Sequence, residues 1–275
     1  MTVETTTTSV TSADGSTIAS YVAGSGPALV IVDPALGLAR NEKKLSAALE
    51  SRFTVIRYDR RGRGGSSDLS PDTADPQHEV DDLAAIIAAH GGSAVLFGSS
   101  SGAVVALEAA ARLADRVSGV VLYEPPFIVD GSRPPLPVDL PAQIAADVAR
   151  GDEGKAVSAF FVEAVGVPKP AVTAMKLMPL WKDAKAIAGT LRYDFAVLEG
   201  TQLGEPLPAG RWAGVTAPGV VMVGSKSEPF FHAGARALAE AVPTIRYEEL
   251  TGGHHGSPQM DPGGGLAARI IERFA

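Results

Sequence analysis

The feature that most constrains this chain is a run of small residues between an apolar stretch and a helix-like stretch. The run is Gly98-Ser99-Ser100-Ser101-Gly102, with apolar residues over 94–97 and a helical pattern over 103–110. G-x-S-x-G between a strand and a helix is typical of a sharp turn that presents a nucleophilic serine. The small neighbours let strand and helix pass closely, and the helix N-terminus favours developing negative charge. We therefore expect Ser100 to be a nucleophile.

Strand-like and helix-like segments alternate around this turn. A hairpin that turns at Asp14-Gly15 comes first. Short strand-like segments, separated by helical patterns, follow at 28–32, 53–57, 94–97, 117–123, 219–223 and 245–250. Such alternation predicts an α/β fold with a doubly wound, mostly parallel sheet.

The alternation stops after Glu124-Pro125-Pro126 and resumes with the strand at 219–223. A Pro-rich stretch follows the break, and helical patterns then cover 140–150, 153–166, 169–176 and 182–198. We predict a core made of residues 1–126 and 213–275, and a helical cap made of residues 127–212. The cap is expected to cover the carboxyl edge of the sheet, where ligands bind in folds of this kind.

A serine hydroxyl needs a neighbouring base to take its proton. His254 and His255 follow the last predicted strand, which is where the base comes in chain order after such a turn. The spacing favours His255 as the base, with His254 as the alternative.

The base needs a carboxylate that orients it, and two positions compete. Glu124 ends the strand at 117–123, whereas Glu228 follows the strand at 219–223. The position after that later strand where Asp is most often found holds Ser227. We favour Glu124 because its strand tip lies beside the nucleophile strand, and we keep Glu228 as the alternative.

Two backbone N–H groups are expected to form an oxyanion hole. One belongs to Ser101, and the other to the loop that starts at Asp33 after the strand at 28–32. Pro34 has no N–H, so Ala35 is the expected donor and Leu36 the next choice. We expect Asp33 to hold this loop through hydrogen bonds to nearby N–H groups.

With these residues in place, the chain resembles the α/β-hydrolase family over essentially its full length. Residues 58–64, Tyr-Asp-Arg-Arg-Gly-Arg-Gly, resemble a turn whose role in that family is mostly structural. The order Ser100, Glu124, His255 resembles the subgroup that includes zearalenone lactonase, as do the loop 32–37 and the cap tripeptide 179–181. The resemblance implies that Trp181 contacts the substrate.

Composition narrows the classes of partner and chemistry. There is no cysteine, which excludes disulfides, cysteine-ligated metals and thiol nucleophiles, and we expect neither a metal nor another cofactor. The net charge of −7 argues against nucleic-acid binding. The sequence contains no apolar run of the ~20 residues that span a bilayer. Because residues 1–5 lack the pattern of a signal peptide, we expect a cytoplasmic location. The sequence leaves the oligomeric state open.

These observations predict a serine hydrolase that cleaves a carboxylic ester or lactone of a neutral, apolar or aromatic small molecule. Within the cap, the expected substrate contacts are Trp181, then Met178 and Phe161. One alternative uses the same three residues for cofactor-free haloperoxidase, C–C hydrolase or lyase chemistry. The other is a ligand-binding protein of the same fold without catalysis.

Overall fold

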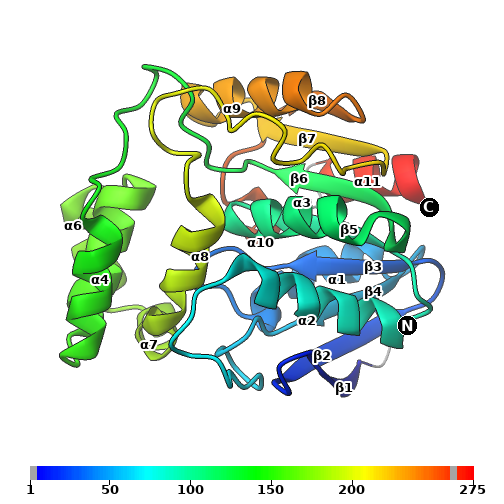
Figure 1. The fold of residues 1–275 in the computed structure, drawn as a ribbon, viewed down its shortest axis with the longest axis horizontal. Coiled ribbons are helices and arrows are strands. Elements are labelled where there is room, and N and C mark those ends of the chain that lie inside the picture. The colour runs from blue at the N-terminus through cyan, green and yellow to red at the C-terminus, as the bar shows by residue number, and fades with distance from the viewer. Residues whose placement is uncertain (1–4, 261–264) are drawn as a thin grey trace.

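An eight-stranded sheet forms the centre of the computed structural model, which describes residues 5–260 and 265–275 (Figure 1). The order is β1-β2-β4-β3-β5-β6-β7-β8; β1 and β2 are antiparallel additions to six parallel strands. The strands are β1 Thr6–Thr11, β2 Thr17–Gly24, β3 Ala28–Val32, β4 Thr54–Tyr58, β5 Ala94–Ser99, β6 Val117–Tyr123, β7 Gly219–Gly224 and β8 Ile245–Leu250. The predicted fold class is confirmed. Residues 1–4 lie outside the described ranges. The predicted start of the core and the expectation about a signal peptide both concern these residues.

Helices cover both faces of the sheet (Figure 1). One face carries α2 (Pro76–Ala89), α3 (Ser101–Leu113) and α9 (Pro229–Ala241); the other carries α1 (Lys43–Leu49), α10 (Ser257–Met260) and α11 (Leu266–Phe274). In β3, Val30 and Val32 pack towards the first set, while Leu29 and Ile31 pack towards the second. Both faces of β3, β5, β6 and β7 are therefore buried, which explains their nearly continuous apolar sequences, whereas the edge strand β8 is partly exposed. Among the described residues, no helix is both long enough and apolar enough to cross a membrane.

The cap helices lie between β6 and β7 in the chain and beyond the carboxyl ends of the parallel strands (Figure 1). They are α4 Leu140–Ala149, α5 Glu153–Ala159, a π-helical turn Phe160–Val165, α6 Lys169–Met175, α7 Pro179–Ala186 and α8 Leu191–Leu198. The prediction of one helix over 182–198 is wrong. A 3-10 turn, Ala188–Thr190, separates α7 from α8, and the Thr190 hydroxyl donates to the Ile187 carbonyl at 2.8 Å.

Close backbone contact at the turn between β5 and α3 explains its two glycines. A Cβ atom on Gly98 would lie 2.2 Å from the Gly102 carbonyl oxygen. A Cβ atom on Gly102 would lie 2.4 Å from the Val32 carbonyl oxygen. Strand β5, helix α3 and strand β3 can therefore approach this closely only because both positions lack a side chain.

We predict that Gly98→Ala lowers the free energy of unfolding by about 1–3 kcal/mol, because the methyl group must displace backbone. Urea unfolding followed by circular dichroism measures the change. Gly131→Ala is the matched control, since no heavy atom lies within 4 Å of its added Cβ. Equal destabilisation by the two substitutions would contradict the packing explanation.

Candidate active site

Three of the four described non-glycine residues with positive φ angles lie on loops around one cavity; the fourth, Ala114, ends helix α3. Ser100 has φ 53° and ψ −126°, and its N–H donates to the Tyr123 carbonyl at 2.9 Å. Leu36 and Glu124 also have positive φ angles, 56° and 49°. Non-glycine residues rarely adopt this region, and such strain clusters at functional sites. The three loops that carry it are those to which the sequence assigns the nucleophile, the oxyanion hole and the acid.

Glu124 and His255 are joined directly. His255 Nδ1 and Glu124 Oε2 lie 2.8 Å apart, and the Glu124 side chain is completely buried. The other oxygen, Oε1, accepts the Gly224 N–H at 2.7 Å and the Ser227 hydroxyl. The His255 ring stacks on Phe231 with ring centroids 4.7 Å apart. These contacts orient the carboxylate and the plane of the imidazole ring.

The two alternative residues are placed differently. Glu228 is exposed at the start of α9; it borders the cavity but makes no hydrogen bond to His254 or His255 within the described ranges. His254 Nδ1 accepts the N–H of Gly256 at 3.1 Å, and its side chain borders a separate depression beside Lys226. The structure thus pairs His255 with Glu124, and not with Glu228.

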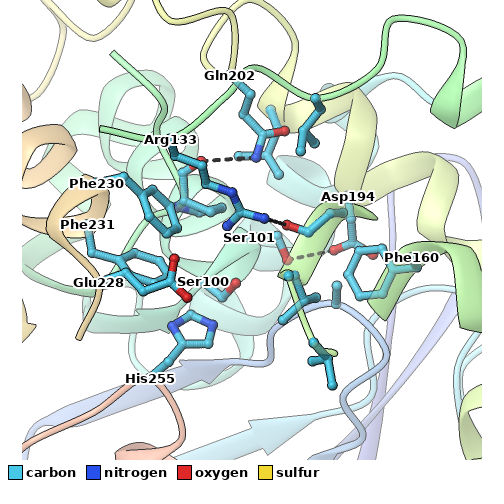
Figure 2. A pocket seen from close by; sticks show the side chains of 18 of the residues that line it. Ser100, Ser101, Arg133, Phe160, Asp194, Gln202, Glu228, Phe230, Phe231 and His255 are labelled. Atoms are coloured by element: carbon cyan, nitrogen blue, oxygen red, sulfur yellow. Dashed lines mark hydrogen bonds between the residues drawn. The ribbon is translucent and has the colours of Figure 1, made fainter. Parts of the chain in front are cut away.

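Ser100, Ser101, Ala35 and His255 all border the same cavity, whose volume is about 320 Å³ (Figure 2). Ser101 is the first residue of α3, so its N–H has no partner within the helix. The Ala35 N–H likewise has no internal partner among the described residues. Both N–H groups are therefore free to donate to a bound oxygen.

The loop that carries Ala35 is held by arginines rather than by Asp33. Both carboxyl oxygens of Asp33 are buried and lack a hydrogen-bond partner among the described residues, so the expected bonds to nearby N–H groups are not formed. Arg60 donates to the Asp33 carbonyl at 3.1 Å, and Arg63 donates to the Pro34 carbonyl at 2.7 Å. Both arginines come from the 58–64 turn, which accounts for its structural role.

A buried ion network joins this loop to the cap and to the serine turn. Asp194 of α8 pairs with Arg60 at 2.7 Å and with Arg63 at 2.8 Å. It also accepts the Ser101 hydroxyl at 2.8 Å (Figure 2). Arg60 in turn makes two bonds of 2.6 Å to Glu79 of α2. The neighbouring guanidinium groups keep the pKa of Asp194 below its ordinary value despite burial.

Asp33 and Glu42 form a second buried group, and it carries no compensating ion pair within the described residues. Burial raises the pKa of Asp33 well above its ordinary value, and the charge of Glu42 adds to this. Burial also raises the pKa of Glu42 from 4.5 to about 7, partly offset by a hydrogen bond from Gln259. Near neutral pH this pair therefore retains protons that ordinary carboxyl groups release.

Aromatic side chains form the cavity walls, but they are not the ones expected. The phenylalanines that border it are Phe160, Phe195, Phe230 and Phe231. Trp181 is instead 7% exposed and packs inside the cap, stacked on Phe161 at a centroid distance of 6.4 Å. Met178 is exposed at the start of α7. None of these three residues borders the cavity with Ser100: Trp181 and Phe161 pack in the cap's own core, and Met178 lies on the surface.

Two polar residues that border the cavity, Arg133 and Gln202, were not predicted from the sequence. Gln202 donates to the Pro126 carbonyl at 3.0 Å. Both belong to loops without periodicity, so no pattern marks them. Phe230 and Phe231 could have been predicted, because they follow the carboxyl end of β7, where ligands bind in parallel sheets.

Comparison with known proteins agrees with this geometry. A model of the alpha/beta hydrolase family matches residues 30–269. An alpha/beta hydrolase from Sphaerobacter thermophilus shares 40% identity over 98% of this chain and 100% of its own, with a TM-score of 0.88. The chain therefore belongs to the alpha/beta hydrolase family.

More distant structures share the fold. An esterase from Rhodococcus sp. has a TM-score of 0.70 at 21% identity, over 98% of this chain and 99% of its own. A thermophilic esterase from Thermogutta terrifontis has a TM-score of 0.72 at 22% identity, over 97% of each chain. A search of curated proteins found no match.

We predict that Asp194→Asn lowers the free energy of unfolding by about 3–5 kcal/mol, because it leaves buried guanidinium charge uncompensated. Chemical unfolding in urea measures the loss. Asp183→Asn is the control: Asp183 lies on cap helix α7, its carboxylate pairs with Arg40 at the protein surface, and 41% of its side chain is exposed. The control is expected to cost less than about 1 kcal/mol. A small effect at Asp194 would show that the network does not bear on stability.

Glu42 makes stability depend on pH in a defined direction. Between its ordinary pKa of 4.5 and about 7, the folded protein holds a proton that the unfolded chain releases. The free energy of unfolding of the wild type should therefore fall, relative to Glu42→Gln, as pH rises through this window, and level off above it. Unfolding in urea at several pH values tests this. Glu205→Gln, an exposed site, controls for the charge change. A constant difference between wild type and Glu42→Gln would refute the raised pKa.

Proposed function

We propose that this protein hydrolyses a carboxylic ester or lactone of a small molecule through Ser100, His255 and Glu124. The observation that carries the proposal is the 2.8 Å contact between His255 Nδ1 and buried Glu124, on the same cavity as the strained Ser100. That contact fixes the tautomer in which Nε2 of His255 is free to accept a proton. The esterase descriptions of the Rhodococcus and Thermogutta structures support the same chemistry.

In the first half of the proposed reaction, Ser100 Oγ attacks the carbonyl carbon while His255 Nε2 takes the hydroxyl proton. The N–H groups of Ala35 and Ser101 donate to the resulting oxyanion. Glu124 stabilises the imidazolium. The C–O bond to the alcohol then breaks, and the leaving oxygen takes the proton from His255. An acyl-enzyme on Ser100 remains.

In the second half, His255 takes a proton from water as the water oxygen attacks the acyl carbon. The bond to Ser100 breaks, and Ser100 regains its proton from His255. The products of an ester are an acid and an alcohol, whereas a lactone gives a single hydroxy acid. The support for a lactone substrate is the chain order Ser100, Glu124, His255, which resembles that of the subgroup that includes zearalenone lactonase.

Intact-mass measurement after exposure to a neutral alkyl fluorophosphonate tests the proposal. We expect one adduct on the wild type, none on Ser100→Ala, and labelling slowed by about 10²–10⁴-fold in Glu124→Gln. Glu228→Gln is the matched control and should label at a rate close to the wild type. Folded wild-type protein that forms no adduct would refute the mechanism. If Glu228→Gln labels slowly and Glu124→Gln labels normally, Glu228 and not Glu124 is the residue that orients His255.

A further inference from the structure

The cavity beside Ser100 contains a positive charge that the proposed hydrolysis does not use. Arg133 lies in the loop between β6 and α4, and its guanidinium projects into the cavity (Figure 2). Its Nη2 donates to the Ala164 carbonyl at 2.8 Å, and the guanidinium carbon lies 4.7 Å from the centroid of the Phe230 ring. These two contacts hold the charge facing the cavity.

No carboxylate of the protein neutralises this charge at close range. Arg133 makes no ion pair within residues 5–260 and 265–275. Asp194 also borders the cavity, but its oxygens are already taken by Arg60, Arg63 and Ser101. Burial lowers the pKa of Arg133, and the charge of exposed Glu228 offsets this only in part. The guanidinium has therefore lost water without gaining an equivalent anionic partner.

A partly dehydrated guanidinium beside aromatic walls is suited to bind a planar anion. Nε and Nη1 of Arg133 have no hydrogen-bond partner among the described residues, and a carboxylate can accept from a guanidinium through both oxygens. The nearby charge of Glu228 favours an anion with one negative charge over a phosphate dianion. A monocarboxylate therefore fits this position best.

We propose that Arg133 binds a carboxylate of the substrate, so that the preferred esters or lactones have an apolar or aromatic body with one carboxylate remote from the scissile bond. Arg133 is then a specificity-determining residue. The sequence of the cap predicts a neutral substrate, whereas this proposal makes the substrate an anion. This inference rests on the proposed function for its reaction, but the binding of the carboxylate does not require catalysis.

Titration calorimetry of the Ser100→Ala variant tests binding without turnover. The probes are benzoate, its neutral isostere benzamide, and phenyl phosphate. We expect benzoate to bind most tightly, and the added substitution Arg133→Met to weaken benzoate by about 10–100-fold, as for a hydrogen bond to a charged group. Benzamide should change much less. Equal affinity for benzoate and benzamide, or tighter binding of phenyl phosphate, would overturn the proposal.

A matched control separates local binding from the loss of one positive charge. Arg236 lies on α9, outside the cavity, with its guanidinium carbon 4.7 Å from the centroid of the Tyr247 ring. It therefore has the same stacking distance as Arg133 on Phe230. Arg236→Met should leave the ratio of benzoate to benzamide affinity unchanged. An equal loss in both methionine variants would assign the effect to net charge and refute the site.

Turnover provides a second readout on the otherwise wild-type enzyme. The ratio of kcat/KM for 4-acetoxybenzoate to that for 4-acetoxybenzamide should fall by about 10–100-fold in Arg133→Met and recover in part in Arg133→Lys. Glu228→Gln should raise the same ratio, because a negative charge near Arg133 is removed.

If the ratio is unaltered in Arg133→Met, the proposal fails even though the esters are hydrolysed. Absent turnover and absent fluorophosphonate labelling, with benzoate still bound through Arg133, would refute hydrolysis alone. If Arg133→Met does not fold, an unaltered ratio in both Arg133→Lys and Glu228→Gln overturns the proposal.

Discussion

The site depends on the buried pairing of Arg60 and Arg63 with Asp194. These three side chains connect cap helix α8, the loop after β3 and, through Ser101, the turn that carries Ser100, the proposed nucleophile. Charges buried this deeply are tolerated only when each has its partner, so the three parts must assemble together. In Figure 1, α8 accordingly lies against the core, whereas α4 and α6 extend away from it.

Glu124, the proposed acid, reaches His255 from the end of β6, one strand earlier than the commoner position after β7. Both positions are feasible because β6 and β7 are neighbours, and Glu124 N–H donates to the Met222 carbonyl at 3.0 Å across them. Ser227, at the commoner position, contributes a hydroxyl that supports Glu124. Ser227 thus holds the carboxylate of Glu124 in place, and Glu228 lies at the cavity rim.

Charge and apolar surface are arranged for different tasks around Ser100. The phenylalanine walls exclude water, which strengthens any electrostatic contact made inside. Arg133 and Glu228 place opposite charges at this boundary, while Asp33 and Glu42 are buried and form no ion pair with the rest of the described chain. The raised pKa values of both carboxyl groups predict that the stability of the fold depends on pH.

The sequence by itself determined the α/β architecture, the elbow at Ser100 and the two short lists from which base and acid come. These signals are local: consecutive residues form the turn, and chain order assigns each loop to one edge of a parallel sheet. The sequence already favours His255 over His254 and Glu124 over Glu228, but only the tertiary structure brings the two favoured side chains together, with Nδ1 and Oε2 2.8 Å apart. The same holds in the cap. Trp181 and Phe195 are both aromatic residues of the predicted cap, and only packing decides which fills the cap core and which borders the cavity. Arg133 and unpaired Asp33 have no sequence signature, since their environments are built from segments far apart in the chain.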